Sequence, residues 1–213
     1  MSINLRVQAE VIDITTDTPQ PEDIFLVDTN IWLWQTYPNV TLNANKTIVR
    51  RSRDYSRYLR KTLSAGSQLK YSGLTLSELA HVIEKTERDI FKREQGLPKL
   101  SAKAYRHSYP SARETVTLLV KAAWDQVTSL ATSADVTVDA ELTQKALHRF
   151  QTQALDGYDL FLLEAISSIR NSPVQVLTDD MDYACVPGIQ LFTQNRLVLE
   201  QAHRQGMLVL RDE

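Results

Sequence analysis

Four acidic residues stand where one fold could gather them into a reaction site, and they are Asp28, Glu78, Asp159 and Asp180. Asp28 directly follows the apolar residues 24–27, and a buried ionised carboxylate is costly unless a partner compensates its charge. Two carboxylates about 5 Å apart repel by roughly 3 kcal/mol at an effective dielectric of about 20. A cluster of four therefore requires a divalent cation, basic side chains or protonation. An all-oxygen site without histidine or cysteine suits Mg²⁺ or Mn²⁺ rather than zinc.

Short apolar runs alternate with amphipathic segments along the chain. The expected strands are residues 4–13, 24–28, 68–75, 135–140, 174–180 and 189–194, and the expected helices are residues 54–66, 76–94, 111–131, 140–153, 156–170 and 196–205. Residues 15–23 and 95–110 are polar and interrupted by prolines, which predicts a loop at residues 15–23 and a loop or an insertion at residues 95–110. Strands that alternate with helices predict an α/β fold with a largely parallel sheet.

The positions of the four acids follow one geometric rule of such folds. The carboxyl ends of parallel strands and the N-terminal ends of the following helices lie on the same rim of the sheet, where ligands bind. Asp28 and Asp180 end expected strands, and Glu78 and Asp159 lie in the first turn of expected helices. We therefore expect all four carboxylates on one rim.

Two of these acids have a purely structural explanation at a helix start. Thr75 and Glu78 have the spacing of a capping box, in which the glutamate bonds back to the first residue of the box. Asp156 could cap its helix, with Asp159 at the third helical position, where the helix dipole favours a carboxylate.

The remaining acids also have structural explanations. Asp28 or Asn30 could cap a helix that begins at Ile31. Ordinary turn residues could account for Asp179, Asp180 and Asp182. These alternatives stay open for each acid alone, although mutual repulsion weakens them for the four acids as a group.

Four segments of the chain resemble, in order, the motifs of the PIN-domain nucleases. They are "FLVDTNIWL" with Asp28 and Asn30, "LTLSELAHVIE" with Glu78, "YDLFLLEAI" with Asp159, and "VLTDDMDYACVPGIQLFT" with Thr178, Asp180, Asp182 and Tyr183. The order and spacing agree along residues 24–194, with two insertions. The resemblance implies a three-layer α/β/α PIN-like fold around a central, mostly parallel sheet. Residues 1–213 would form a single domain, with an N-terminal extension at residues 1–23 and a helical insertion at residues 95–150.

The resemblance also implies metal-dependent hydrolysis of phosphodiester bonds, usually of RNA, with Mg²⁺ or Mn²⁺ as the cofactor. The implied catalytic and metal-binding residues are Asp28, Glu78, Asp159 and Asp180, with Asp182 as an alternate metal ligand. Asn30 and Thr178 would orient these ligands through hydrogen bonds. Attack by water would leave 5′-phosphate and 3′-hydroxyl ends. A metal-free route would need general acid–base histidines, and no paired motif in the sequence offers them.

A basic stretch at residues 46–61 is a candidate for substrate contact. It carries seven lysines and arginines against one acid, with two tyrosines interleaved. Arginines bind phosphates in a bidentate manner, and tyrosines stack on unpaired bases. The residues expected to bind nucleic acid are Arg50, Arg51, Arg53 and Arg57. The alternative is a solvated helix face or a surface for an acidic partner.

The composition bounds the class of protein. The 213 residues are 43% hydrophobic and 23% charged, which is ordinary for a globular protein. A single cysteine, Cys185, excludes an internal disulfide and a multi-cysteine zinc site. The N-terminus lacks the layout of a signal peptide, and no apolar run approaches the length of a membrane span. We therefore expect a cytoplasmic protein.

Several functions compete with simple RNA cleavage. The toxin of a toxin–antitoxin module would have an antitoxin protein as partner, and the family resemblance suggests a homodimer. A non-catalytic PIN-like scaffold would bind RNA or protein, and a DNA-directed or structure-specific nuclease would use the same acids. An aspartate-nucleophile phosphatase would need Asp-x-Asp, whereas this chain has Asn30 two residues after Asp28. Metal-dependent cleavage separates these classes.

Overall fold

A six-stranded parallel sheet forms the centre of the protein. The computed structural model describes residues 4–37, 39, 46–134, 137–155, 157–167 and 173–211. The strands run in the order β1-β6-β5-β2-β3-β4, and every described pair is parallel. Their bounds are β1 Glu10–Asp13, β2 Ile24–Val27, β3 Gln68–Tyr71, β4 Thr132–Ser133, β5 Val174–Leu177 and β6 Ile189–Thr193. The expected α/β fold with a parallel central sheet is confirmed.

Strand β2 is the centre of this sheet. It pairs with β3 on one side and with β5 on the other, so that Leu26 lies opposite both Lys70 and Val176. The side chains of Phe25, Leu26 and Val27 are essentially inaccessible to solvent. A strand covered on both faces needs apolar residues at consecutive positions, which is the pattern of this run.

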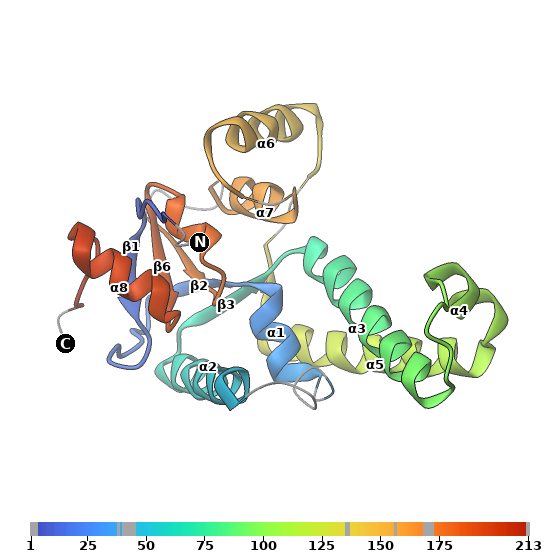
Figure 1. The fold of residues 1–213 in the computed structure, drawn as a ribbon. Helices are drawn as coiled ribbons and strands as arrows, with labels where there is room; N and C mark the ends of the chain where they lie inside the picture. Colours follow the sequence, from blue (N-terminus) through green and yellow to red (C-terminus); the bar gives the residue numbers. More distant parts are fainter. Residues whose placement is uncertain are drawn as a thin grey trace.

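Helices cover both faces of the sheet and give three layers (Figure 1). One core cluster joins Phe25 and Phe192 of the sheet to helices α1, α2, α3 and α5. The other joins Val176 and Leu191 to helices α6, α7 and α8. Their bounds are α1 Thr29–Thr36, α2 Lys46–Ala65, α3 Gly73–Glu94, α5 Pro110–Leu130, α6 Ala140–Thr152, α7 Gly157–Ser167 and α8 Arg196–Gln205. Alternate residues of each strand therefore pack against the helices of opposite layers.

Helices α3 and α5 extend beyond the sheet as a pair, with helix α4 (Ala102–Ser108) at their far end (Figure 1). Of the two alternatives expected at residues 95–110, the loop is wrong at α4, and the insertion stays a prediction. Ser101 caps this helix by accepting a bond from the Ala104 N–H, and Tyr105 anchors it against Phe91 of α3. A helix of seven residues has too few turns to show a clear apolar period, so the sequence did not predict it.

The largest differences from the expected element boundaries are at α2, at the edge strand β4 and at the early strand β1. Helix α2 begins at Lys46 rather than at residue 54. The sequence did not predict its first two turns, because their residues are mostly basic and exposed and form no apolar face. The edge strand expected at residues 135–140 lies instead at Thr132–Ser133, where it pairs with β3; residues 135 and 136 lie outside the described part. The early strand is short and occupies only Glu10–Asp13.

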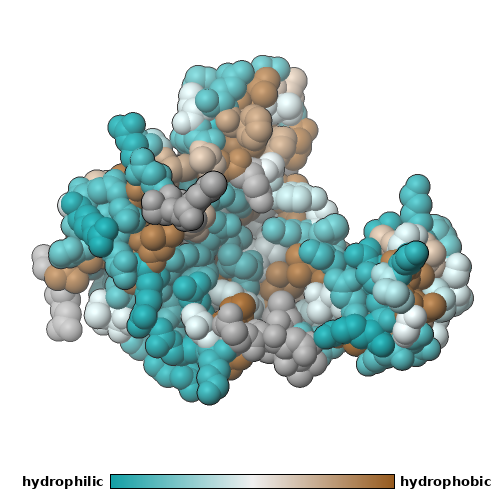
Figure 2. All heavy atoms as spheres, viewed as in Figure 1, coloured by the Kyte–Doolittle hydropathy of each residue, from teal (hydrophilic) through white to brown (hydrophobic). Residues whose placement is uncertain are grey.

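The surface is mostly hydrophilic in the view of Figure 2, with apolar residues gathered over α6 and α7. The exposed apolar side chains of these helices include Leu147, Phe150 and Tyr158.

Among the described residues, no helix combines the length and the apolar character needed to cross a bilayer. The division into an extension at residues 1–23 and an insertion at residues 95–150 stays a prediction, although β1 pairs with β6 within the sheet.

The start of α3 is fixed by Ser72, and this predicts a measurable effect on stability. The Ser72 hydroxyl accepts from the Leu74 N–H at 3.1 Å, and Thr75 Oγ1 accepts from the Ser72 N–H at 3.3 Å. We expect Ser72→Ala to lower the free energy of unfolding by about 1 kcal/mol, measured by urea denaturation. Ser77→Ala, an exposed change inside the same helix, is the control and should have little effect or stabilise slightly. Equal losses in both variants would contradict the capping role.

Candidate active site

Two central strands bring their carboxyl ends together at the candidate site. Asp28 follows β2 and Thr178 follows β5, and these strands are neighbours in the sheet. The Thr178 hydroxyl donates to Asp28 Oδ2 at 2.5 Å across a sequence separation of 150 residues. The Asp28 N–H donates to the Leu177 carbonyl at 3.1 Å. The pairing of β2 with β5 therefore fixes both residues on the same rim.

The Asp28 carboxyl is buried and electrostatically strained. The residue is only 5% exposed, and burial, together with the negative charges of Glu78 and Asp180, raises its pKa to about 7. The hydrogen bond from Thr178 opposes part of this increase. Asp28 occupies the N-cap position of α1, but within the described residues its side chain makes no capping hydrogen bond. The capping explanation for this carboxylate is therefore wrong.

Glu78 approaches the rim from helix α3. The helix begins at Gly73 after its Ser72 cap, so Glu78 lies in the second turn and not in the first. The capping box pairs Ser72 with Thr75, so the alternative explanation, in which Thr75 pairs with Glu78, is wrong. Glu78 is half-buried, and its charge acts on Asp28. A carboxylate that does not cap its helix, yet repels another acid, lacks the simplest structural explanation.

Asp159 enters from helix α7 and is held by an aromatic residue of the final motif. The Tyr183 hydroxyl donates to Asp159 Oδ1 at 2.5 Å, and both residues are buried. Burial raises the pKa of Tyr183 well above its usual value, and the charges of Asp28, Asp159 and Asp180 raise it further. Tyr183 therefore lies within electrostatic reach of three of the four acids. Asp156, the suggested cap of this helix, lies outside the described residues.

The segment after β5 orders the remaining candidates. The Asp180 N–H donates to Thr178 Oγ1 at 2.9 Å, and Asp180 Oδ1 accepts from the Asp182 N–H at 2.9 Å. The second bond is a turn contact, so the turn explanation holds in part for Asp180. Asp182 is the first residue of a short 3₁₀ helix, η2 (Asp182–Cys185), and its N–H forms this local bond with Asp180.

Asn30 completes the polar network around Thr178. Its Nδ2 donates to Thr178 Oγ1 at 3.4 Å, so the amide lies beside the Asp28–Thr178 pair. Its Oδ1 is buried and has no hydrogen-bond partner among the described residues. An unsatisfied buried acceptor is costly, and it adds a further oxygen to a donor set made entirely of oxygens.

The donor chemistry of this rim fits a hard divalent cation. Carboxylate and amide oxygens are the ligands that Mg²⁺ and Mn²⁺ prefer, and the mutual repulsion felt by Asp28 is the kind that such a cation relieves. Within the described part of the chain, however, no three histidine, cysteine or acidic side chains are arranged so that they could hold a metal ion. Glu78 and Asp180 therefore act electrostatically on Asp28, but the described residues do not form a complete set of metal ligands.

Asp179 and Tyr55 belong to the same rim. The sequence indicated Asp179 only as a turn residue, and it indicated Tyr55 and Tyr58 as tyrosines that could stack on bases, which is wrong because both are fully buried. Arg51 Nη1 lies 2.7 Å from Asp179 Oδ2 in an ion pair. The Tyr55 hydroxyl lies 2.9 Å from the Thr178 carbonyl and 3.1 Å from Asp179 Oδ1, and it accepts from the Gln194 N–H. Burial raises the pKa of Asp179, and the charge of Arg51 opposes this. The signal in the sequence was the run of adjacent acids after β5.

The four arginines expected to bind nucleic acid do not share one location. Arg50 and Arg51 line a hollow together with Arg196, which the sequence did not indicate. Arg57 lines a second hollow, and its guanidinium lies 3.7 Å from the Asp54 carboxylate. Arg53 is exposed and is not among the described residues that line either hollow.

Comparison with known proteins adds little to this geometry. The sequence matches no protein-family model and no curated protein. Among solved structures it is similar to the crystal structure of VapBC2 from Rickettsia felis bound to a DNA fragment from their promoter. That similarity has a TM-score of 0.46 and 15% identity, over 80% of this chain and 98% of that chain. A likeness at this level carries no argument about function.

Proposed function

We propose that the protein is a metal-dependent endoribonuclease that hydrolyses phosphodiester bonds at the rim formed by β2 and β5. The observation that carries the proposal is the Thr178–Asp28 hydrogen bond, because it fixes a buried carboxylate at the junction of two central strands. Glu78 and Asp180 lie close enough to raise the pKa of Asp28, and Tyr183 holds Asp159 nearby. These contacts support a site that draws on acids from four separate segments, as the PIN-type motifs suggest.

The residues proposed to hold Mg²⁺ or Mn²⁺ are Asp28, Glu78, Asp159 and Asp180, with Asp182 as an alternate ligand. A bound metal supplies a water of lowered pKa and charge neutralisation for the phosphoryl group. Thr178 holds the Asp28 carboxylate in orientation, and Asn30 in turn holds Thr178. Tyr183 does the same for Asp159. Such supporting contacts typically change metal affinity or activity by about 10–100-fold when removed.

The proposal extends to the biological setting. We propose that the substrate is RNA. We also propose that the protein acts as the toxin of a toxin–antitoxin module, with an antitoxin protein as its partner. The exposed apolar side chains on α6 and α7, which include Leu147 and Phe150, are a surface that such a partner or a second copy could cover. A small antitoxin-like reading frame beside the gene supports this setting, and its absence argues against it.

Cleavage assays with matched acidic variants test the nuclease proposal. Single-stranded RNA and DNA are incubated with the protein in Mn²⁺, in Mg²⁺ and in chelator. We expect chelation to abolish cleavage and Asp180→Asn to lower its rate by about 100-fold. Asp125→Asn is the control, because this exposed carboxylate on α5 pairs only with Lys121 of the same helix among the described residues.

The pattern of outcomes separates the competing functions. Cleavage that survives both chelation and Asp180→Asn would refute the proposed mechanism. Binding of RNA without cleavage in any metal would favour the non-catalytic scaffold, a reading that the unfinished ligand geometry among the described residues also favours. Preferential cleavage of DNA would replace the ribonuclease with a DNA-directed nuclease.

A further inference from the structure

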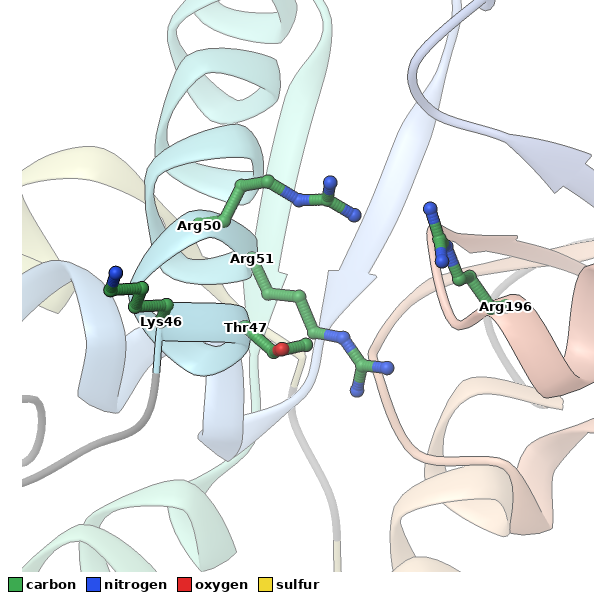
Figure 3. A pocket seen from close by; sticks show the side chains of 5 residues that line it. All are labelled: Lys46, Thr47, Arg50, Arg51 and Arg196. Carbon is green, nitrogen blue, oxygen red and sulfur yellow. The ribbon is translucent and has the colours of Figure 1, made fainter.

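A basic hollow of about 250 Å³ lies between the first two turns of α2 and the first turn of α8. Its walls are Lys46, Thr47, Arg50 and Arg51 from α2, and Arg196 from α8. Figure 3 shows the side chains of Arg50 and Arg51 extending from α2 toward Arg196 on the opposite wall. Both helices begin at the hollow, since Lys46 and Arg196 are their first residues. The positive ends of two helix dipoles therefore add to the charge of the side chains.

The hollow carries an excess of positive charge. Of the five described residues that line it, four are cationic. Arg51 is paired with Asp179, but among the described residues no carboxylate lies within ion-pair distance of Lys46, Arg50 or Arg196. Cations gathered around one small space repel each other, and a bound anion would relieve that repulsion.

The two walls are held at a fixed separation by the segment after β5. Arg51 bonds to the Asp179 carboxylate at 2.7 Å, and the Arg51 carbonyl accepts from Gln194 Nε2 at 3.0 Å. On the other wall, Asn195 Nδ2 donates to the Asp179 carbonyl at 2.8 Å, and Asn195 Oδ1 caps α8 by accepting from the Leu197 N–H. Asp179 therefore ties both walls together, and it directly precedes Asp180 of the acid cluster. The hollow is preorganised beside the candidate active site.

We propose that this hollow is a subsite for one phosphate group of the nucleic-acid substrate, adjacent to the position of cleavage. The proposal rests on the proposed nuclease function for the identity of the substrate, and on the hollow itself for the phosphate. Arginine presents a planar fork of donors that matches phosphate oxygens, and a phosphate offers more acceptor oxygens to several arginines at once than a single carboxylate does. Arg50 and Arg196, which have no carboxylate within ion-pair distance among the described residues, also suit a phosphate better than one carboxylate of an acidic peptide.

Binding measured in chelator tests the subsite apart from cleavage. Orthophosphate is titrated by calorimetry, and short RNAs with a 5′-phosphate or a 5′-hydroxyl are titrated by fluorescence anisotropy at several salt concentrations. We expect Arg50→Gln and Arg196→Gln each to raise the Kd for RNA roughly tenfold and to reduce the salt slope by about one. Arg60→Gln is the matched control, because it removes an equal charge from an exposed position on α2 outside the hollow.

Each outcome decides a separate point. Loss of orthophosphate binding in both hollow variants but not in Arg60→Gln supports the subsite, whether or not the protein cleaves RNA. Tighter binding of 5′-phosphorylated RNA assigns the hollow to a chain end, and equal binding assigns it to an internal phosphodiester. Equal losses in all three variants would overturn the subsite in favour of a diffuse basic face. Displacement of RNA by an acidic peptide but not by orthophosphate would overturn it in favour of a protein partner. Thermal melts confirm that each variant is folded.

Discussion

Near pH 8 in chelator, the Asp28→Asn variant should unfold at a temperature about 5 °C higher than the native protein, while losing about 100-fold or more in cleavage rate. The two effects have one cause. Burial and the charges of Glu78 and Asp180 raise the pKa of Asp28 from 3.8 to about 7, so the ionised carboxylate opposes folding. Moving a pKa by this amount corresponds to roughly 4 kcal/mol. Loss of activity with a gain in stability is typical of residues kept for function.

The sign of this effect follows from proton linkage. Because the folded state holds the proton of Asp28 more tightly than the unfolded state, the contribution of Asp28 to stability is fully present below its unfolded pKa of 3.8. That contribution is lost as the pH rises through about 7. The difference in melting temperature between Asp28→Asn and the native protein should therefore be small near pH 4, grow between about pH 4 and 7, and level off above that.

Melting curves across pH, with and without Mn²⁺, check this prediction. Mn²⁺ should raise the melting temperature of the native protein and leave that of Asp28→Asn nearly unchanged, because a ligand that binds only the folded state stabilises it. Asp125→Asn should follow the native curve under all conditions. A variant that melts below the native protein near pH 8 would show that the Asp28 carboxylate is needed for stability rather than for function.

The Arg211→Met variant is expected to lose about 3–5 kcal/mol of stability. The Arg211 guanidinium bonds to Asp17 at 2.6 Å and to Asp23 at 2.8 Å, and the side chains of these acids are only 2% and 4% exposed. It also lies 4.8 Å from the ring centroid of Phe192, and Tyr58 donates a hydrogen bond to Asp17. Methionine preserves much of the packing volume but leaves two buried carboxylates without their cation. An uncompensated buried charge is among the most damaging results of a single substitution.

Urea denaturation of matched variants checks this ion cluster. Arg204→Met removes an equal charge from an exposed position on α8 and should change stability by less than about 0.5 kcal/mol. Adding Asp17→Asn and Asp23→Asn to Arg211→Met should recover part of the loss, because the unpaired charges are then gone. A loss below about 1 kcal/mol in Arg211→Met, or no recovery in the triple variant, would contradict a buried charge as the cause.

The features that the sequence predicted are those with a local pattern. The apolar run before Asp28 predicted a strand covered on both faces, and the parallel α/β rule predicted which ends of the strands would carry the acids. The start of α3 was missed because Ser72 and Thr75 both offer a capping residue three positions apart, and local sequence does not choose between them. Arg196 was missed because its position opposite α2 depends on a contact between distant segments.

Contacts between distant segments leave no periodic signal in the chain. Arg196 faces the basic residues of α2 only because α8 is tied to the segment after β5. The partners of Arg211 are 188 and 194 residues away in the sequence, so no spacing rule could have joined them. Such pairs become visible only once the order of strands is known.

The strand order also has a consequence for how the protein is made. Residue Asp28 is translated early, but its partner Thr178 lies 150 residues later, on a strand that pairs directly with β2. While the ribosome is still synthesising the intervening helices, Asp28 has neither Thr178 nor Asp180 beside it. Under the proposed function, the nascent chain would therefore lack a complete acid site until β5 has emerged and paired with β2.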